Sequence, residues 1–150
     1  MKSQYVKNLL INVMNISDNE LPTYAREGDA GMDICAAEDL EIPPMEWKVV
    51  RTGIHIELPE GYECQIRSRS GLAAKHGIQV LNSPGTIDSG YRGEIMVILK
   101  NNHNTKSYEV KYGDRIAQMV FAKFLTAHFH KVKVLEGSER GEGGLGSTGK

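Results

Sequence analysis

The sequence predicts an all-β domain, and three observations carry that prediction. Short runs rich in apolar and β-branched residues recur along the chain. Turn-forming residues separate them, as in Pro43-Pro44, Ser83-Pro84-Gly85 and Tyr112-Gly113-Asp114. Only one stretch, residues 71–76, favours a helix. Many short strands punctuated by turns are typical of a β-sandwich or barrel.

The elements follow in order along the chain. The runs that predict strands are residues 9–14, 30–36, 48–58, 63–68, 79–81, 94–100, 108–111, 116–124 and 131–135. Each combines residues that suit a pleated, half-buried surface with a turn signal at its end. The predicted helix, Gly-Leu-Ala-Ala-Lys-His at 71–76, is barely longer than one turn, and Arg69-Ser70-Gly71 resembles its start.

Composition places the chain among ordinary globular proteins. It has 150 residues, 40% of them hydrophobic and 25% charged, which is a one-domain length with a sizeable core. No apolar run approaches the ~20 residues that cross a bilayer, and the N-terminus lacks a signal-peptide pattern. We therefore expect a soluble protein with no membrane partner, cytoplasmic or otherwise intracellular, and nuclear only if the source is eukaryotic or viral.

The net charge and the two cysteines narrow the range of ligands that we expect. The net charge of −1 argues against direct nucleic-acid binding, which normally needs a basic face, but leaves room for a polyphosphate ligand. Cys35 and Cys64 are far apart in apolar, strand-like surroundings, so we expect buried free thiols rather than a disulfide or zinc site. The histidines are scattered and indicate no metal cage.

The composition shifts near residue 136. Six of the last fourteen residues are glycine, and Leu145 is their only large apolar side chain. Such a segment cannot bury enough surface to offset its ordering entropy. We expect a β domain over residues 1–135 and a flexible tail over 136–150. The tail is either simply disordered or an artificial extension, or it is a mobile lid that closes on a phosphate-bearing substrate.

Residues 85–94, Gly-Thr-Ile-Asp-Ser-Gly-Tyr-Arg-Gly-Glu, are the most informative segment. Gly85 and Gly90 would permit a tight turn before the buried run at 95–99. A strand-edge hairpin that presents Asp88 and Tyr91 could bind a small molecule. It could equally be an ordinary β-hairpin.

Four further segments decide between these interpretations. They read Ala-Gly-Met-Asp at 30–33, Arg-Ser-Gly-Leu-Ala at 69–73, Gly-Asp-Arg-Ile-Ala-Gln at 113–118 and Arg-Gly-Glu-Gly-Gly-Leu-Gly-Ser-Thr-Gly at 140–149. In this order, together with residues 85–94, they closely resemble the five signature motifs of the homotrimeric deoxyuridine triphosphatases (dUTPases). The resemblance implies a jelly-roll-like (β-clip) single domain in a homotrimer with shared active sites, where one subunit's tail closes over a pocket formed by two others.

The resemblance also implies an activity: hydrolysis of dUTP to dUMP and pyrophosphate by attack of water on the α-phosphate. That reaction limits uracil incorporation into DNA and supplies dUMP for dTMP synthesis. Two alternatives stay open, a dCTP deaminase of the same fold and a dUTPase-like, nucleotide-gated binding module. The deaminases use a glutamate base in a different motif, whereas this chain has Asp88.

The resemblance also implies which residues contact the nucleoside end of the substrate. Asp88 matches the aspartate that contacts the 3′-hydroxyl and orients the water, and a carboxylate can accept the proton of that water. Tyr91 would lie under C2′ of the sugar and exclude ribose. Asn82 would read the uracil edge through its amide. Thr86 and Ile87 would line the pocket, with further base contacts from the region that ends at Met96.

The resemblance implies that residues of the other motifs bind the phosphate end of the substrate. Ser70 and Gly71 at the helix start, with Arg69, would bind the phosphate chain, joined by Gln118. Arg140 would clamp the γ-phosphate when the tail closes. Arg67 could be a second cation or a solvated surface residue. We expect Asp114 and Arg115 to form an ion pair at a turn.

The resemblance leads to specific expectations for Leu145 and for Asp33. Leu145, next to the substrate-binding Gly146, stands where most relatives have a phenylalanine that stacks on uracil, so lid closure should be weaker here. The expected cofactor is Mg²⁺, held mainly by phosphate oxygens and waters. The resemblance implies that Asp33 assists from its outer shell.

Overall fold

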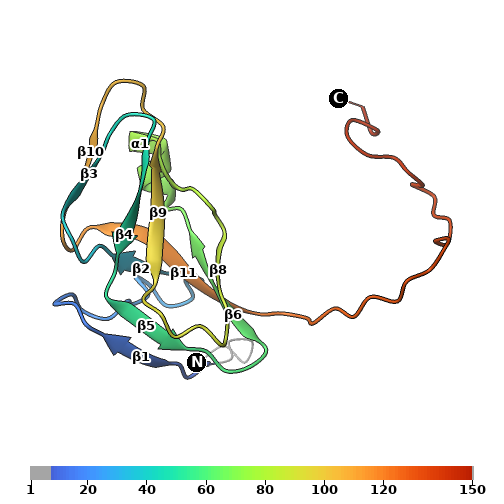
Figure 1. Cartoon of the computed structure of the whole chain (residues 1–150), viewed down its shortest axis with the longest axis horizontal. Coiled ribbons are helices and arrows are strands. Elements are labelled where there is room, and N and C mark those ends of the chain that lie inside the picture. The colour runs from blue at the N-terminus through green and yellow to red at the C-terminus, as the bar shows by residue number, and fades with distance from the viewer. Residues whose placement is uncertain (1–7, 150) are drawn as a thin grey trace.

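The computed structural model describes residues 8–149 and is built of strands with a single short helix (Figure 1). The strands are β1 (Asn12–Asn15), β2 (Gly31–Cys35), β3 (Leu40–Ile42), β4 (Trp47–Arg51), β5 (Ile54–Glu57), β6 (Tyr62–Arg67), β7 (Ile78–Val80), β8 (Gly85–Ile87), β9 (Met96–Asn101), β10 (Tyr108–Val110) and β11 (Arg115–Lys123). The helix α1 is Ser70–His76. The prediction of an all-β domain with one short helix is confirmed.

The strands form two larger and two smaller antiparallel sheets. The larger ones have the orders β2-β11-β6-β8 and β4-β9-β7, and the smaller ones are the pairs β1-β5 and β10-β3. β11 is the centre of the first, pairing with β2 on one side and β6 on the other. Neighbours far apart in sequence are therefore brought side by side, which lets distant motifs meet.

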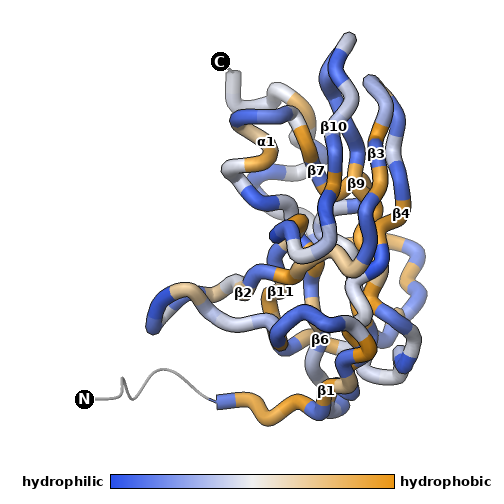
Figure 2. The backbone as a smooth tube through the Cα atoms, turned by 90° about the vertical axis from the view of Figure 1, so that its left-hand side faces the viewer, coloured by the Kyte–Doolittle hydropathy of each residue, from blue (hydrophilic) through white to orange (hydrophobic). Residues whose placement is uncertain are grey.

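Alternating burial explains why these runs are strands. In β9 the side chains of Val97, Leu99 and Asn101 are buried while the residues between them are more exposed. Figure 2 shows hydrophobic and hydrophilic residues interleaved along the strands. The buried side chains form one core, which includes Ile34, Ile42, Val50, Ile66, Ile78, Val97, Leu99, Ile116 and Met119. A period of two, with one face buried, specifies strand register.

Most predicted elements are confirmed, with informative differences. The predicted strand at 48–58 is two strands, β4 and β5. Gly53 lies between them with a φ of +70°, which interrupts the extended backbone. β3 and β8 were not predicted as strands, since each adjoins turn residues, Pro43-Pro44 and Ser83-Pro84. The strand predicted at 131–135 is wrong: this segment pairs with no strand among residues 8–149, and all of its residues are exposed.

The chain leaves the body after β11. The backbone N–H of Phe124 donates to the Gly61 carbonyl (3.1 Å), and residues 125–149 then run away from the body (Figure 1). Leu125, Phe129, Val134 and Leu135 are exposed along this segment. We call residues 125–149 the arm. Without a partner, its apolar side chains have nothing to pack against.

The two cysteines differ in burial. Both cysteines are free, but only Cys64 is fully buried, and its burial raises the pKa of the thiol to about 12. Cys35 is half-buried, so the expectation of burial is wrong for it. In the described part of the chain, no helix has the length and apolar character needed to cross a membrane.

Candidate active site

A pocket opens beside β8 and holds most of the predicted nucleoside-binding residues. It encloses about 230 Å³. Its lining consists of Ile66, Val80, Asn82, Gly85, Thr86, Ile87, Asp88, Tyr91 and Met96. The residues predicted for the base, sugar and general base therefore lie on one hollow, except Leu145, which was predicted to cover the base and lies outside the lining. We call it the nucleoside pocket.

Gly85 has a different role from the predicted one. It lies in β8, and neither Gly85 nor Gly90 has a positive φ, so neither supports a turn that only glycine could make. A Cβ on Gly85 would lie 3.3 Å from the Asn82 side-chain nitrogen and 3.4 Å from Ile66 Cβ. Glycine at 85 thus leaves room for the Asn82 amide to lie against the strand.

The segment that carries Asp88 is a connection between sheets. β8 pairs with β6, whereas β9 pairs with β4 and β7, so the hairpin expected over residues 85–99 is wrong. A turn closed by the Tyr91 N–H and the Asp88 carbonyl (3.1 Å) reverses the chain. The Asp88 side chain is exposed, and no hydrogen bond or ion pair within residues 8–149 engages its carboxylate. It is therefore available to a substrate or a water.

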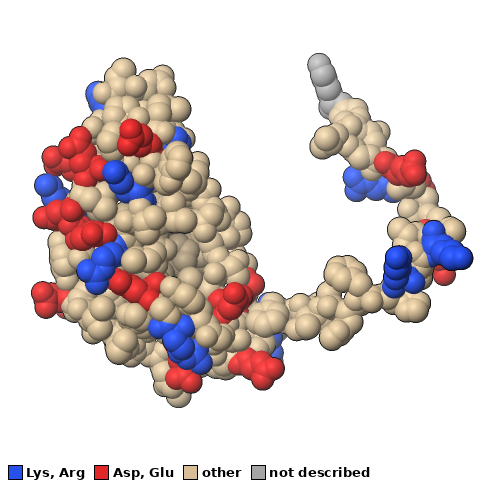
Figure 3. All heavy atoms as spheres, viewed as in Figure 1, with Lys and Arg blue, Asp and Glu red and all other residues tan. Residues whose placement is uncertain are grey.

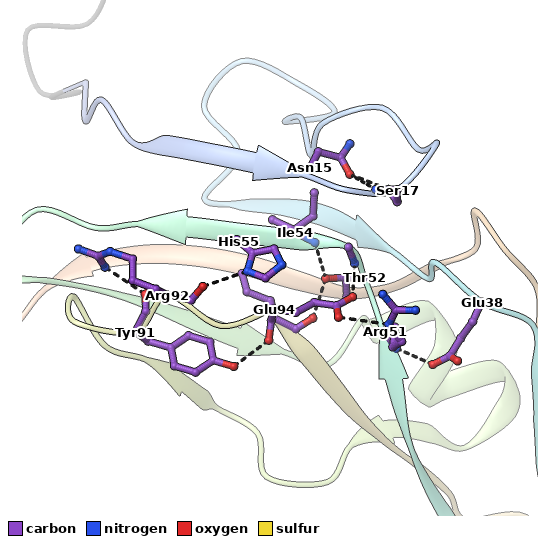
Figure 4. A network of polar contacts seen from close by, with 12 residues as sticks. Asn15, Ser17, Glu38, Arg51, Thr52, Ile54, His55, Tyr91, Arg92 and Glu94 are labelled. Atoms are coloured by element: carbon purple, nitrogen blue, oxygen red, sulfur yellow. Dashed lines mark hydrogen bonds and ion pairs between the residues drawn. The ribbon is translucent and has the colours of Figure 1, made fainter.

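Tyr91 is held through its hydroxyl. Its Oη donates to the backbone carbonyl of Glu94 (2.8 Å), and the ring lies along the segment that follows it (Figure 4). Glu94 in turn accepts from the Gly53 N–H (2.7 Å) and from Arg51 Nε (3.2 Å). These contacts tie the loop of Tyr91 to the junction of β4 and β5.

A second cluster gathers around Asp33 on β2. Arg69 Nε lies 3.0 Å from Asp33 Oδ1, and Arg115 lies 3.5 Å from Asp33 Oδ2. Arg69 also donates to the Arg115 carbonyl (3.0 Å). The predicted pair of Arg115 with Asp114 is wrong: Asp114 accepts from the Lys111 N–H instead, which closes its turn. We call Asp33, Arg69 and Arg115 the arginine cluster.

Gln118 lies beside this cluster because of strand register. On β11 it is opposite Asp33 of β2 and Arg67 of β6, and residues opposite one another in a sheet share a face. A Cβ on Gly31 would lie 3.2 Å from Gln118 Oε1, so that glycine leaves room for the amide. Arg67 is exposed and donates through Nε and a terminal nitrogen to Gln65 Oε1 (3.0 and 2.7 Å).

Ser70 and Gly71 form the first turn of α1, next to Arg69. Both are exposed, and Arg69 occupies the N-cap position without a side-chain cap. The first N–H groups of the helix are therefore not satisfied by a capping side chain. None of these residues, nor Gln118, lines the nucleoside pocket. Within one chain, the predicted base and phosphate sites are separate.

The predicted tail residues are apart from both clusters. Arg140 Nε donates to the Gly143 carbonyl (2.8 Å), and Leu145 and Gly146 are exposed. Figure 3 shows the arm standing away from the body, with acidic and basic side chains along it. Short turns over 138–141, 140–143 and 144–147 give the arm its local shape.

The surroundings of Asp33 suit a metal ion that is bound through water. No three His, Cys, Asp or Glu side chains of residues 8–149 converge on one point. Both oxygens of Asp33 already face arginines, and its side chain is only 19% exposed. A carboxylate has about four lone-pair positions, so Asp33 can still accept from a metal-bound water. It fits an outer-shell role for Mg²⁺ better than a direct ligand.

Sequence reasoning missed several residues that shape the site. Ile66 and Val80 line the pocket, yet they are strand residues whose only sequence signal is alternation. Gly93 and Glu94 follow Tyr91 in the same motif, and their contacts to it become visible only in three dimensions.

The fold and these two clusters define the class of the protein: a small all-β protein with a pocket beside a carboxylate that has no partner among residues 8–149, and a separate set of arginines. The dUTPase family model matches residues 17–149. The chain belongs to the dUTPase family.

Its relatives cover nearly the whole chain. It is 54% identical over 133 residues to the deoxyuridine 5′-triphosphate nucleotidohydrolase of Clostridium tetani, covering 89% of this chain and 91% of that one. The same enzyme of Wolinella succinogenes is 50% identical over 146 residues, 97% of each chain.

Solved structures agree with the sequence comparison. The dUTPase of Staphylococcus bacteriophage 80alpha with dUPNHPP superposes with a TM-score of 0.87 at 31% identity, covering 94% of this chain and 99% of that one. A point mutant of the dUTPase from phage phi11 of S. aureus, whose structure reveals the coordination of a structural Mg(II) ion, gives 0.78 at 27% identity, with 85% and 99% covered. The jelly-roll-like fold is confirmed.

Proposed function

We propose that the chain hydrolyses dUTP to dUMP and pyrophosphate, with Asp88 as the general base. The observation that carries this assignment of roles is the nucleoside pocket, where Asp88, Tyr91 and Asn82 line one hollow. Family membership supplies the reaction: the chain is a dUTP diphosphatase, a hydrolase of a phosphoric anhydride.

Asp88 activates the attacking water. Its carboxylate accepts a proton as the water oxygen bonds to the α-phosphorus, and the bond from that phosphorus to the bridging oxygen breaks. The pyrophosphate leaves with the electron pair of the broken bond. An exposed carboxylate at a pocket rim, without a competing partner in the described chain, supports this role.

Asn82, Thr86, Ile87 and Met96 select the base, and Tyr91 selects the sugar. An amide offers both a donor and an acceptor, which matches the edge of uracil. The Tyr91 ring forms a wall under C2′, and a ribose hydroxyl there would clash and lose its hydrogen bonds to water.

The phosphates bind at the arginine cluster and at the start of α1. Arg69 provides charge, Ser70 and Gly71 provide hydroxyl and N–H donors, and Gln118 provides an amide. Mg²⁺ bound with the substrate would neutralise phosphate charge, and Asp33 would orient one of its waters. Arg140 and Gly146 bring the arm over the phosphates, and Leu145 covers the base.

A complete site needs more than one copy of the chain. Residues that would hold one substrate lie in two separate clusters and on an arm that leaves the body. The sheet β4-β9-β7 also has a partly apolar face with exposed Trp47 and Val49, which register places opposite Lys100 and Ile98. An exposed apolar face of this kind marks an interaction surface. We infer a homotrimer whose subunits share sites. The arm would reach a neighbour and would include the lid proposed at 136–150, whose last residue lies outside the described part of the chain.

The substrate sets the cellular role. Removing dUTP limits its use by polymerases, and the dUMP formed supplies dTMP synthesis. Because these nucleotide pools lie inside cells, an intracellular location in the cytoplasm or nucleus follows from the proposed function.

The test is pyrophosphate release from dUTP, dCTP, dTTP and UTP with Mg²⁺, measured beside Asp88→Asn. We expect release from dUTP alone and its loss by a factor of about 10³ or more in the variant, since the base is removed while shape is kept. Asp114→Asn, a carboxylate that only closes a turn, is the matched control. Ammonia released from dCTP in place of pyrophosphate would contradict the proposal.

A further inference from the structure

We propose that Gly93 and Glu94 are positioning residues that hold the Tyr91 ring in place and thereby set the discrimination between deoxyribose and ribose. The inference rests on the proposed role of Tyr91 as the wall under the sugar. Neither residue lines the nucleoside pocket, so each would act only through Tyr91.

Gly93 provides the space that the tyrosine ring occupies. A Cβ built on Gly93 would lie 2.5 Å from Tyr91 Cζ and 2.9 Å from Cε2, and closer still to the hydroxyl. Real Cβ atoms essentially never approach other atoms below 3.0 Å. The ring therefore lies directly against the Gly93 backbone, and any side chain at this position must displace one or the other.

The backbone around Gly93 cannot easily be the part that yields. Before it, the Arg92 carbonyl accepts from His55 Nδ1 (2.9 Å). After it, the Ile95 N–H donates to the Ile54 carbonyl (2.8 Å), and Ile95 is fully buried. Both anchoring residues, His55 and Ile54, belong to β5. Tyr91, by contrast, is 43% exposed, and the end of its ring is held by one hydrogen bond, from its hydroxyl to the Glu94 carbonyl.

Glu94 fixes the other side of the ring. Its carbonyl accepts the Tyr91 hydroxyl, while its carboxylate accepts from the Gly53 N–H and from Arg51 (Figure 4). The Glu94 side chain is only 13% exposed, so these bonds are partly shielded from water. Loss of the carboxylate would remove these two bonds from the residue whose carbonyl accepts the tyrosine hydroxyl, and would leave the Ile95 N–H as the nearest anchor of that carbonyl.

The first experiment compares kcat/KM for dUTP and UTP in wild type, Gly93→Ala and Gly90→Ala. The displaced ring should open space for a ribose hydroxyl, so the dUTP-to-UTP ratio should fall about tenfold or more in Gly93→Ala, since an apolar wall contributes on the order of 10² to such discrimination. Gly90→Ala adds the same methyl group to the same loop where nothing lies within 4 Å, and should leave the ratio unchanged.

A double-variant cycle separates a positioning role from a general loss of structure. In a Tyr91→Ala background there is no ring to displace, so Gly93→Ala should change the ratio no further. If Tyr91→Ala lowers the ratio and Gly93→Ala does not, the inference is overturned and the role of Tyr91 stands. If Tyr91→Ala itself leaves the ratio unchanged, the proposed role of Tyr91 fails first.

Glu94 gives an independent measurement. Glu94→Gln keeps an oxygen that can accept from the Gly53 N–H, so it should retain most of the discrimination that Glu94→Ala loses. Affinities for non-hydrolysable imido analogues of dUTP and UTP, measured by calorimetry, should follow the same order. Equal ratios in the two variants and wild type would overturn the role of Glu94.

Discussion

At the scale of a residue, the proposed lid carries Leu145 where the family resemblance implies a phenylalanine. The Leu145 side chain is fully exposed on the arm, so no residue of the body packs against it. A leucine can cover the base with apolar surface, but it lacks the face on which a base stacks.

We therefore predict that Leu145→Phe improves catalysis. Base–aromatic stacking is worth ~1–3 kcal/mol relative to alanine, and leucine already provides part of it. A gain of ~1 kcal/mol corresponds to a roughly fivefold lower KM or higher kcat. Steady-state kinetics on dUTP would measure it, with Leu135→Phe, also exposed on the arm, as control. No change in either constant would rule out contact between residue 145 and the base.

At the scale of elements, the meeting of β2, β11 and the start of α1 assembles the arginine cluster. Asp33 holds Arg69 and Arg115, which would otherwise repel each other. Such partly exposed pairs contribute about 1 kcal/mol or less each. Asp33 is thus well placed for function but of modest value for stability.

Asp33→Asn separates these two contributions. The amide oxygen can still accept from Arg69, so we expect the thermal unfolding midpoint to shift by only a few degrees. If Asp33 orients a Mg²⁺-bound water, the Mg²⁺ concentration for half-maximal activity should rise severalfold. A titration of activity with Mg²⁺ measures this effect. An unchanged Mg²⁺ requirement with lowered stability would make Asp33 purely structural.

At the scale of the whole molecule, one chain carries the parts of the proposed site in separate places. The nucleoside pocket, the arginine cluster and the arm are separate in a single copy. A closed symmetric assembly can unite them, because each interface then repeats around the axis.

Mixing two inactive variants tests this arrangement. Asp88→Asn lacks the base, and a chain ending at residue 135 lacks the lid. Unfolded and refolded together, they should recover roughly a quarter of wild-type activity, because random assembly pairs an intact Asp88 with a neighbour's lid in about that share of sites. Light scattering should show a trimer for each. Trimers without recovered activity would mean that each site uses its own lid.

The sequence could predict strands, motifs and residue chemistry, because alternation, turn residues and charged side chains are local properties. The resemblance of the motifs to those of dUTPases implied the roles of Asp88, Tyr91 and Asn82, and all three line one pocket. The partner of Arg115 was predicted wrongly, because sequence proximity favoured Asp114, whereas strand pairing brings Asp33 of β2 close to the start of β11.

By itself, the sequence determined the all-β class, the single helix, the order of the five motifs and the leucine at position 145. Only the tertiary structure decided that residues 88–95 connect two sheets, that Asp33 binds two arginines, and that Gly93 makes room for Tyr91. The physical reason is that these features depend on which strands pair and on the clearance between side chains. Both arise from contacts that form only when the chain is folded, which no local pattern encodes.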